Sequence, residues 1–107
     1  MTEEQFIEIT NWQKETFGQA TSMSKLAHLE KEIYELEEEL KFIKQNKDNV
    51  ESEFADCFIL LFGAAASNGM NYEDICNCIE SKMKINKQRK WGKPDENGVV
   101  NHVKQTK

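Results

Sequence analysis

Helix-breaking residues are scarce in this chain and separate a few long segments. The 107 residues include one proline, at position 94, and five glycines. Because glycine and proline are the strongest local breakers of regular structure, this distribution favours four helices and no strands. The sequence therefore predicts an all-α fold.

We expect the helices over residues 3–15, 24–44, 49–68 and 71–90. Ser24 and Asn71 are the expected N-caps of the second and fourth helices, since both side chains can accept hydrogen bonds from backbone N–H groups. Gly69 is the expected left-handed residue after the third helix. Turn-forming residues follow Pro94, and a short tail ends the chain.

The expected second helix carries apolar residues with a 4-3-4-3 spacing, which predicts a buried stripe: Leu29, Ile33, Leu36, Leu40 and Ile43. Glu32 and Glu35 lie on one flank of this stripe, together with His28. The spacing therefore predicts an acidic edge beside a core rather than a uniformly charged surface.

A second acidic pair, Glu53 and Asp56, precedes the apolar run Cys57–Phe62 in the expected third helix. Carboxylates beside a buried surface are unfavourable unless a cation neutralises them. One such pair arises easily by chance among 19 acidic residues, but two pairs together favour a metal site. Oxygen ligands of this kind suit Mg²⁺, and Mn²⁺ as an alternative.

The expected fourth helix changes character along one face. Its apolar positions, Ile75 and Ile79, are followed at the same helical phase by Lys82, Asn86 and Arg89. Such a row of donors can bind phosphate oxygens. The alternative is that the two cations pair with the acidic helix and have only a structural role.

Composition excludes several classes of function. The net charge is −5, which argues against a broad basic surface for a nucleic-acid polymer. The longest apolar run is about half the length that spans a bilayer, and the polar first residues differ from a secretory signal. We therefore expect a cytoplasmic protein without membrane contact, with its three cysteines as reduced thiols.

Together these motifs resemble the MazG-like, all-α nucleoside triphosphate pyrophosphatases. The family signature, ExxE followed by ExxD, matches Glu32–Glu35 and Glu53–Asp56, with 17 residues between the two elements. Lys82, Asn86 and Arg89 resemble the phosphate-binding positions of the family. The sequence from Asn86 to Asp95, with Trp12 and the Thr16-Phe17-Gly18 turn, is similar to the dATP/dGTP pyrophosphohydrolase branch that is common in phages.

The resemblance implies a single domain over residues 1–107, with residues 93–107 as a tail, folded as a four-helix bundle that forms a homodimer or homotetramer. It implies cleavage of dGTP or dATP to the monophosphate and pyrophosphate by water attack. The implied Mg²⁺ ligands are Glu32, Glu35, Glu53 and Asp56, one of them doubling as general base. For the purine base we expect stacking on Trp12, with Phe17 as the alternative.

Other functions remain open at this point. A non-catalytic helical dimer or adaptor would explain the acidic edge as a solvated margin, but it leaves the basic row unexplained. A di-iron bundle would need Glu-x-x-His pairs, which neither motif provides. A pyrophosphatase of the same fold acting on dUTP, dCTP or phosphoribosyl-ATP shares the signature, so base and sugar preference, metal number and oligomeric state are not decided.

Overall fold

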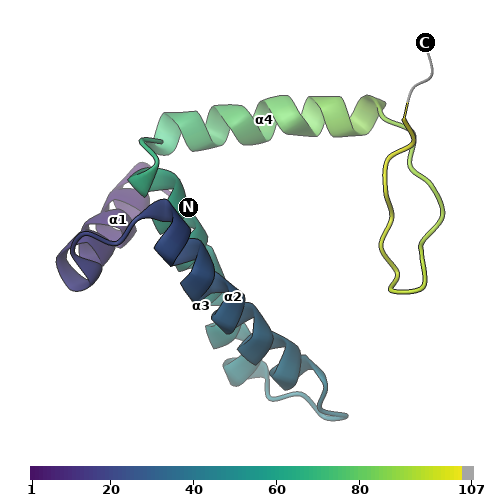
Figure 1. Ribbon diagram of the computed structural model, residues 1–107, viewed down its shortest axis with the longest axis horizontal. Helices are drawn as coiled ribbons and strands as arrows, with labels where there is room; N and C mark the ends of the chain where they lie inside the picture. Colours follow the sequence, from purple (N-terminus) through teal and green to yellow (C-terminus); the bar gives the residue numbers. More distant parts are fainter. Residues whose placement is uncertain (105–107) are drawn as a thin grey trace. The chain divides into compact units, whose positions relative to one another are not determined.

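Four helices account for most of the chain. The computed structural model describes residues 1–104, and Figure 1 shows α1 (Glu3–Phe17), α2 (Ser22–Leu40), α3 (Lys47–Ser67) and α4 (Tyr72–Gln88). No strand occurs in this described part of the chain, where the only strand-like feature is an isolated bridge between Trp91 and His102. The all-α prediction is confirmed.

The helices belong to two compact units. The first extends from Met1 to Ile75 and holds α1, α2 and α3, while the second begins at Cys76 and holds most of α4 and the C-terminal segment. The single domain over residues 1–107 stays a prediction. Of its expected tail, residues 105–107 lie outside the described part of the chain.

The core of the first unit lies where α1, α2 and α3 meet. In Figure 1, α2 and α3 lie side by side in opposite directions, and Ser22 Oγ of α2 donates to the Ala64 carbonyl of α3 at 2.7 Å. Across the other contact, the α1 side chain of Gln13 is fully buried and its Nε2 donates to the Ile59 carbonyl at 2.7 Å. This amide occupies the space left by the missing side chain of Gly63.

Helix boundaries follow the capping side chains. Asn71 caps α4 as predicted, accepting a hydrogen bond from Asp74 N at 2.8 Å, and Gly69 has a φ of 91° after α3. The predicted cap at Ser24 is wrong: Thr21 Oγ1 accepts from Ser24 N at 3.1 Å, so the N-cap lies three residues earlier than expected and α2 begins at Ser22. Thr21 and Ser24 both carry a hydroxyl group that could cap the helix. Thr21 does so, and the Ser24 hydroxyl instead donates to the Thr21 carbonyl.

The predicted stripe on α2 is only partly buried. Leu36 lies in the core, whereas Ile33 and Leu40 are each 40% exposed. Residue Ile43 is fully exposed, because α2 ends at Leu40 instead of residue 44 and Asn46 caps α3. The apolar spacing of Ile75, Ile79 and Met83 on the fourth helix also predicts that all three face inward, which is wrong for Ile79 and Met83, since about half of each side chain is exposed.

The C-terminal segment folds back onto the end of α4 within the second unit. The Gly92 N–H donates to the Asn101 carbonyl at 2.8 Å, and the Val103 N–H donates to the Lys90 carbonyl at 2.7 Å. The turn between them forms at Asp95, whose Oδ1 accepts from Val99 N, and at Gly98, where φ is 77°. The turn predicted after Pro94 is therefore present.

None of the helices within residues 1–104 is long and apolar enough to span a membrane.

Candidate functional site

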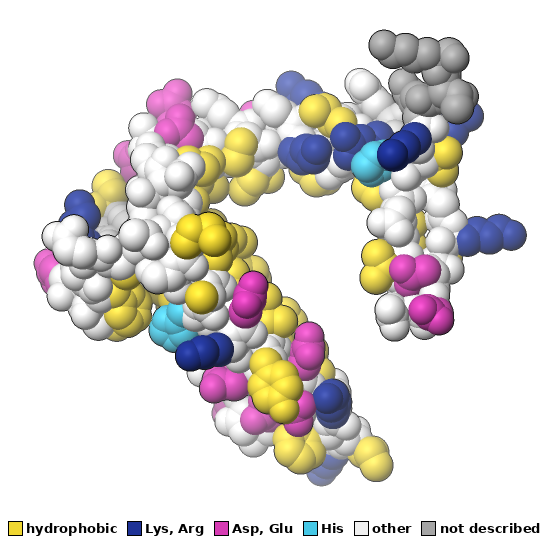
Figure 2. Space-filling model, in the orientation of Figure 1, with side chains coloured by type: hydrophobic (Ala, Val, Ile, Leu, Met, Phe, Trp, Pro, Cys, Tyr) yellow, Lys and Arg dark blue, Asp and Glu magenta, His cyan; other side chains and the backbone are white. Residues whose placement is uncertain are grey.

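The two acidic pairs meet across the contact between α2 and α3. Glu32 and Glu35 lie one turn apart on α2, and Glu53 faces them from α3; one carboxylate oxygen from each lies within 4.8 Å of the other two. One-turn spacing places each pair on one helix face, and the antiparallel packing brings the two faces together. The sequence motif thus becomes a cluster in space, and acidic side chains are visible along this part of the molecule in Figure 2.

The carboxylates of this cluster repel one another when they are ionised without a cation between them. Partial burial raises the pKa of Glu32 to about 7, and the neighbouring carboxylates of Glu35, Asp56 and Glu53 add to this effect. Glu53 Oε2 is buried and accepts no hydrogen bond from residues 1–104. A buried carboxylate oxygen without a donor is costly, so the cluster favours either protonation or a bound cation.

Asp56 stands outside the group of three but belongs to the same neighbourhood. Its negative charge contributes to the raised pKa of Glu32. It also acts on Cys57, whose thiol pKa is raised by burial and then by the charges of Glu32, Glu53 and Asp56. Cys57 is therefore a protonated thiol beside the carboxylates rather than a reactive thiolate.

Among the histidine, lysine and arginine side chains of the described residues, His28 is the only one within 4.0 Å of any of these four carboxylates, and it contacts that of Glu32. Its Nε2 lies 3.4 Å from Glu32 Oε1, and the histidine side chain is 45% exposed. His28 was expected on the acidic flank but without a role in the site. The four-residue spacing to Glu32 was the signal, since side chains four residues apart are neighbours on a helix.

The donor set fits a hard divalent cation. It offers carboxylate oxygens from two helices, and one of these oxygens is buried without a hydrogen-bond partner among the described residues. Such oxygens are the preferred ligands of Mg²⁺ and Mn²⁺. Among residues 1–104, no lysine or arginine nitrogen lies within 4.0 Å of Glu32, Glu35, Glu53 or Asp56. Within the described part of the chain, neither a lysine nor an arginine therefore supplies the charge compensation.

A line of ring contacts leads from the carboxylates to α1. The Phe17 ring meets His28 edge-on with centroids 5.8 Å apart, and Trp12 meets Phe17 edge-on at 5.5 Å. Half of the Trp12 side chain is exposed. The two aromatic residues that the sequence offered for the base thus lie together in the first unit, next to the histidine that contacts Glu32.

The predicted phosphate-binding row lies in the second unit. Lys82 and Asn86 are on α4, and Arg89 follows its last residue; Arg89 Nη1 donates to Asn86 Oδ1 at 3.4 Å. The backbone carbonyl of Asn86 accepts a hydrogen bond from Trp91 Nε1 at 3.0 Å. Neither Lys82 nor Arg89 has an ion pair with a carboxylate of residues 76–104, so within this unit both cations remain available to an anion.

Comparisons with known proteins agree with this chemistry. The sequence matches the family model described as dATP/dGTP pyrophosphohydrolase over residues 6–107. The structure is similar to a cyanophage S-2L MazG-like pyrophosphohydrolase that was solved bound to dGDP and three catalytic Mn²⁺ ions per active site. That similarity has 25% sequence identity and a TM-score of 0.78, and covers 99% of this chain and 97% of the other. No curated protein matches the sequence.

The family match extends over nearly the whole sequence, and the similar structure has the same all-α MazG-like fold. Both favour an enzyme over the non-catalytic adaptor that the sequence left open. The chain belongs to the dATP/dGTP pyrophosphohydrolase family and is a nucleotide pyrophosphohydrolase.

Proposed function

We propose that this enzyme hydrolyses dGTP or dATP to the deoxynucleoside monophosphate and pyrophosphate, using Mg²⁺ or Mn²⁺. The observation that carries the proposal is the cluster of Glu32, Glu35 and Glu53, which gathers three carboxylate oxygens within 4.8 Å. The family match supports the purine substrates. The similar phage enzyme, bound to dGDP and Mn²⁺, supports both a guanine nucleotide and a divalent metal.

Four carboxylates, those of Glu32, Glu35, Glu53 and Asp56, would hold the metal. When bound, a divalent cation neutralises the charge of substrate oxygens and lowers the pKa of a coordinated water. The buried Oε2 of Glu53, which has no donor among the described residues, supports its role as a ligand. His28 would hold the Glu32 carboxylate in place through the 3.4 Å contact. One of the glutamates would take the proton of the attacking water.

The phosphates of the substrate would bind to Lys82, Asn86 and Arg89. The guanidinium of Arg89 offers a fork of donors that matches phosphate oxygens, while Lys82 offers a compact charge. The hydrogen bond from Arg89 to Asn86 fixes the position of the guanidinium on the segment that follows α4. These groups would stabilise negative charge that the metal does not neutralise.

The purine base would stack on Trp12. Its indole is half exposed and is supported from one edge by Phe17. Stacking on an exposed aromatic ring is a common way to bind a base. Because Phe17 also contacts His28, a base at Trp12 would lie on the same side of the first unit as the glutamates.

A homodimer or homotetramer would cover the apolar side chains that the helices leave exposed. Phe58 and Leu61 on α3 are 58% and 50% exposed, and Ile79 and Met83 on α4 are also about half exposed. Exposed apolar residues in such number are typical of an interface between protein chains. Light scattering after gel filtration tests this assignment, with a mass of one chain as the contradicting result.

The reaction itself is tested by its products. Hydrolysis between the α and β phosphates of dGTP yields dGMP and pyrophosphate, whereas attack at the terminal phosphate yields dGDP and inorganic phosphate. Phosphorus NMR of the reaction mixture distinguishes the two. We expect dGMP and pyrophosphate only, and dGDP as a product would contradict the proposal. Parallel reactions with dUTP and dCTP test the pyrimidine alternatives.

A further inference from the structure

A buried lysine in the first unit lacks a carboxylate partner. Only 7% of Lys25 is exposed, and its Nζ donates to Ser67 Oγ at 2.6 Å, with the Gly63 carbonyl at 3.5 Å. No aspartate or glutamate within residues 1–104 lies within 4.0 Å of this ammonium group. Lysines are almost never this buried unless an opposite charge accompanies them.

The end of α3 compensates only part of this charge. Gly63 and Ser67 belong to the last turns of α3, where the helix dipole corresponds to roughly half a negative charge. The Ser67 hydroxyl is neutral. An ammonium group has three donors, and the two contacts leave one of them for a further acceptor.

Lys25 lines an open pocket whose other residues are also suited to an anion. The pocket has a volume of about 610 Å³, within the range of small-molecule sites. Lys14 is its second cation, and Ser67 contributes a hydroxyl group, whereas the hydroxyls of Thr10 and Ser22 donate to the carbonyls of Ile7 and Ala64. None of the lining residues is acidic, although aspartate and glutamate make up 19 of the 107 residues of this chain.

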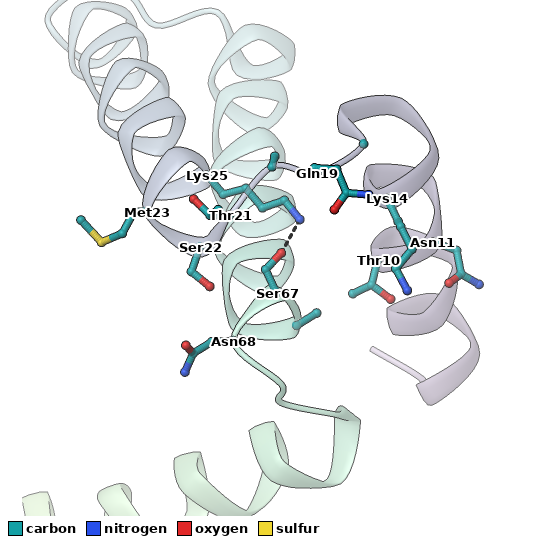
Figure 3. A pocket seen from close by; sticks show the side chains of 13 residues that line it. Thr10, Asn11, Lys14, Gln19, Thr21, Ser22, Met23, Lys25, Ser67 and Asn68 are labelled. Atoms are coloured by element: carbon teal, nitrogen blue, oxygen red, sulfur yellow. Dashed lines mark hydrogen bonds between the residues drawn. The ribbon is translucent and has the colours of Figure 1, made fainter.

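Three parts of the first unit contribute to this pocket. In Figure 3, Lys25 extends from α2 toward Ser67 on α3, and Thr10 and Lys14 come from α1. The loop between α1 and α2 closes the pocket on a third side through Gln19. Lys25 precedes Glu32 by seven residues on α2, which is about 10 Å along a helix. The carboxylates of Glu32, Glu35 and Glu53 do not line the pocket.

We propose that this pocket is a second binding site, which takes a small phosphorylated anion with Lys25 and Lys14 as its cations. A phosphate group would accept hydrogen bonds from both ammonium groups and from the hydroxyl of Ser67. The phosphate belongs either to a nucleotide or to a free phosphate or pyrophosphate. A nucleotide and a free phosphate would contact the lysines in the same way. They differ in whether binding requires the nucleoside.

The test measures anion binding by the whole chain in EDTA, so that neither turnover nor metal-bridged binding at the glutamates contributes. Calorimetric titrations with inorganic phosphate, pyrophosphate and dGMP compare the natural chain with Lys25→Met, which keeps the length of the side chain. Lys31→Met on the same helix is the exposed control. Arg89→Ala separates this pocket from the proposed phosphate-binding row of the second unit.

We expect at least one of the three anions to bind, with affinity at least about tenfold weaker in Lys25→Met and unchanged in Lys31→Met and Arg89→Ala. Binding of dGMP alone assigns a nucleotide phosphate, and binding of phosphate or pyrophosphate assigns a free one. If circular dichroism shows that Lys25→Met is unfolded, Lys14→Gln carries the same test, since Lys14 is exposed.

Two results would overturn the proposal. One is the absence of binding for all three anions at millimolar concentration. The other is binding that is as strong in Lys25→Met, or in Lys14→Gln where that variant carries the test, as in the natural chain; its loss in Arg89→Ala would then assign it to the row of the second unit. Because turnover plays no part in these titrations, a failure here is distinguishable from a failure of the proposed hydrolysis.

Discussion

His28 Nε2 lies 3.4 Å from Glu32 Oε1, and the histidine ring also meets the Phe17 ring edge-on. This residue therefore connects the carboxylate cluster to the aromatic residues of α1. A group that holds a metal ligand in place typically changes metal affinity by about 10- to 100-fold when it is removed.

Replacing His28 with alanine should weaken metal activation. We expect the Mn²⁺ concentration for half-maximal activity to rise by about tenfold, with a smaller fall in kcat at saturating metal. His28→Gln, which keeps a hydrogen-bonding group, should restore part of the loss. Lys31→Gln, an exposed change three residues along the same helix, is the control. Equal metal dependence in His28→Ala and the natural chain would assign His28 to surface packing.

The raised pKa of Glu32 should make stability depend on pH. Partial burial raises this pKa from 4.5 to about 7, so between these values the folded chain binds more protons than the unfolded chain. The contribution of Glu32 to the free energy of unfolding is therefore present below pH 4.5 and lost as the pH rises through 7, by at most about 3 kcal/mol.

Denaturant unfolding in EDTA at fixed protein concentration measures this loss. We expect the free energy of unfolding to fall less steeply between pH 5 and 8 in Glu32→Gln than in the natural chain. Glu30→Gln, which changes an exposed neighbour on α2, should leave this fall unchanged. Added Mn²⁺ should restore stability most strongly at the high end of the range, because it neutralises the ionised carboxylates. A pH profile that is identical in Glu32→Gln and the natural chain would contradict the assignment.

Removing the indole of Trp12 should weaken substrate binding. Stacking of a base on an aromatic side chain contributes about 1–3 kcal/mol, so Trp12→Ala should raise the KM for dGTP by about tenfold or more with a smaller effect on kcat. Trp12→Phe should recover most of the affinity. Phe42→Ala removes an exposed aromatic ring from the segment between α2 and α3 and serves as the control. A KM that is unchanged in Trp12→Ala would place the base elsewhere.

The close approach of α1 and α3 at Gly63 should be sensitive to a single methyl group. A Cβ at this position would overlap the side-chain amide of Gln13, so Gly63→Ala should lower the free energy of unfolding by about 1–3 kcal/mol. Gln13→Ala alone removes the hydrogen bond to the Ile59 carbonyl. In the double variant the overlap disappears. Urea unfolding should therefore show a smaller loss of unfolding free energy than the sum of the losses in the two single variants. Additive losses would contradict the contact.

The sequence was sufficient to predict the helices and the acidic cluster because both depend on local rules. Glycine and asparagine marked the boundary between α3 and α4, and one-turn spacing put each carboxylate pair on one face. The end of α2 was not predictable from spacing, because Ile43 continues the apolar pattern but has nothing to pack against.

Polar residues in the core escaped prediction for a related reason. Apolar periodicity identifies buried positions by side-chain type, so it overlooks Gln13 and Lys25, which are both buried. Their burial depends on partners from α3, the Ile59 carbonyl for Gln13 and Ser67 for Lys25. These are contacts between distant segments, which local patterns do not contain.

The central claim is that the carboxylates of α2 and α3 support metal-dependent hydrolysis of a purine deoxynucleoside triphosphate. The direct measurement is pyrophosphate release from each of the four dNTPs, with Mg²⁺, Mn²⁺ or EDTA, by the natural chain, Glu53→Gln and Glu51→Gln. The matched control is Glu51, a largely exposed residue near the start of α3. Its Oε1 lies 3.8 Å from Lys47 Nζ. We expect metal-dependent release that is fastest with dGTP or dATP, abolished in Glu53→Gln and retained in Glu51→Gln. Full activity in Glu53→Gln, or equal release in EDTA, would contradict the account.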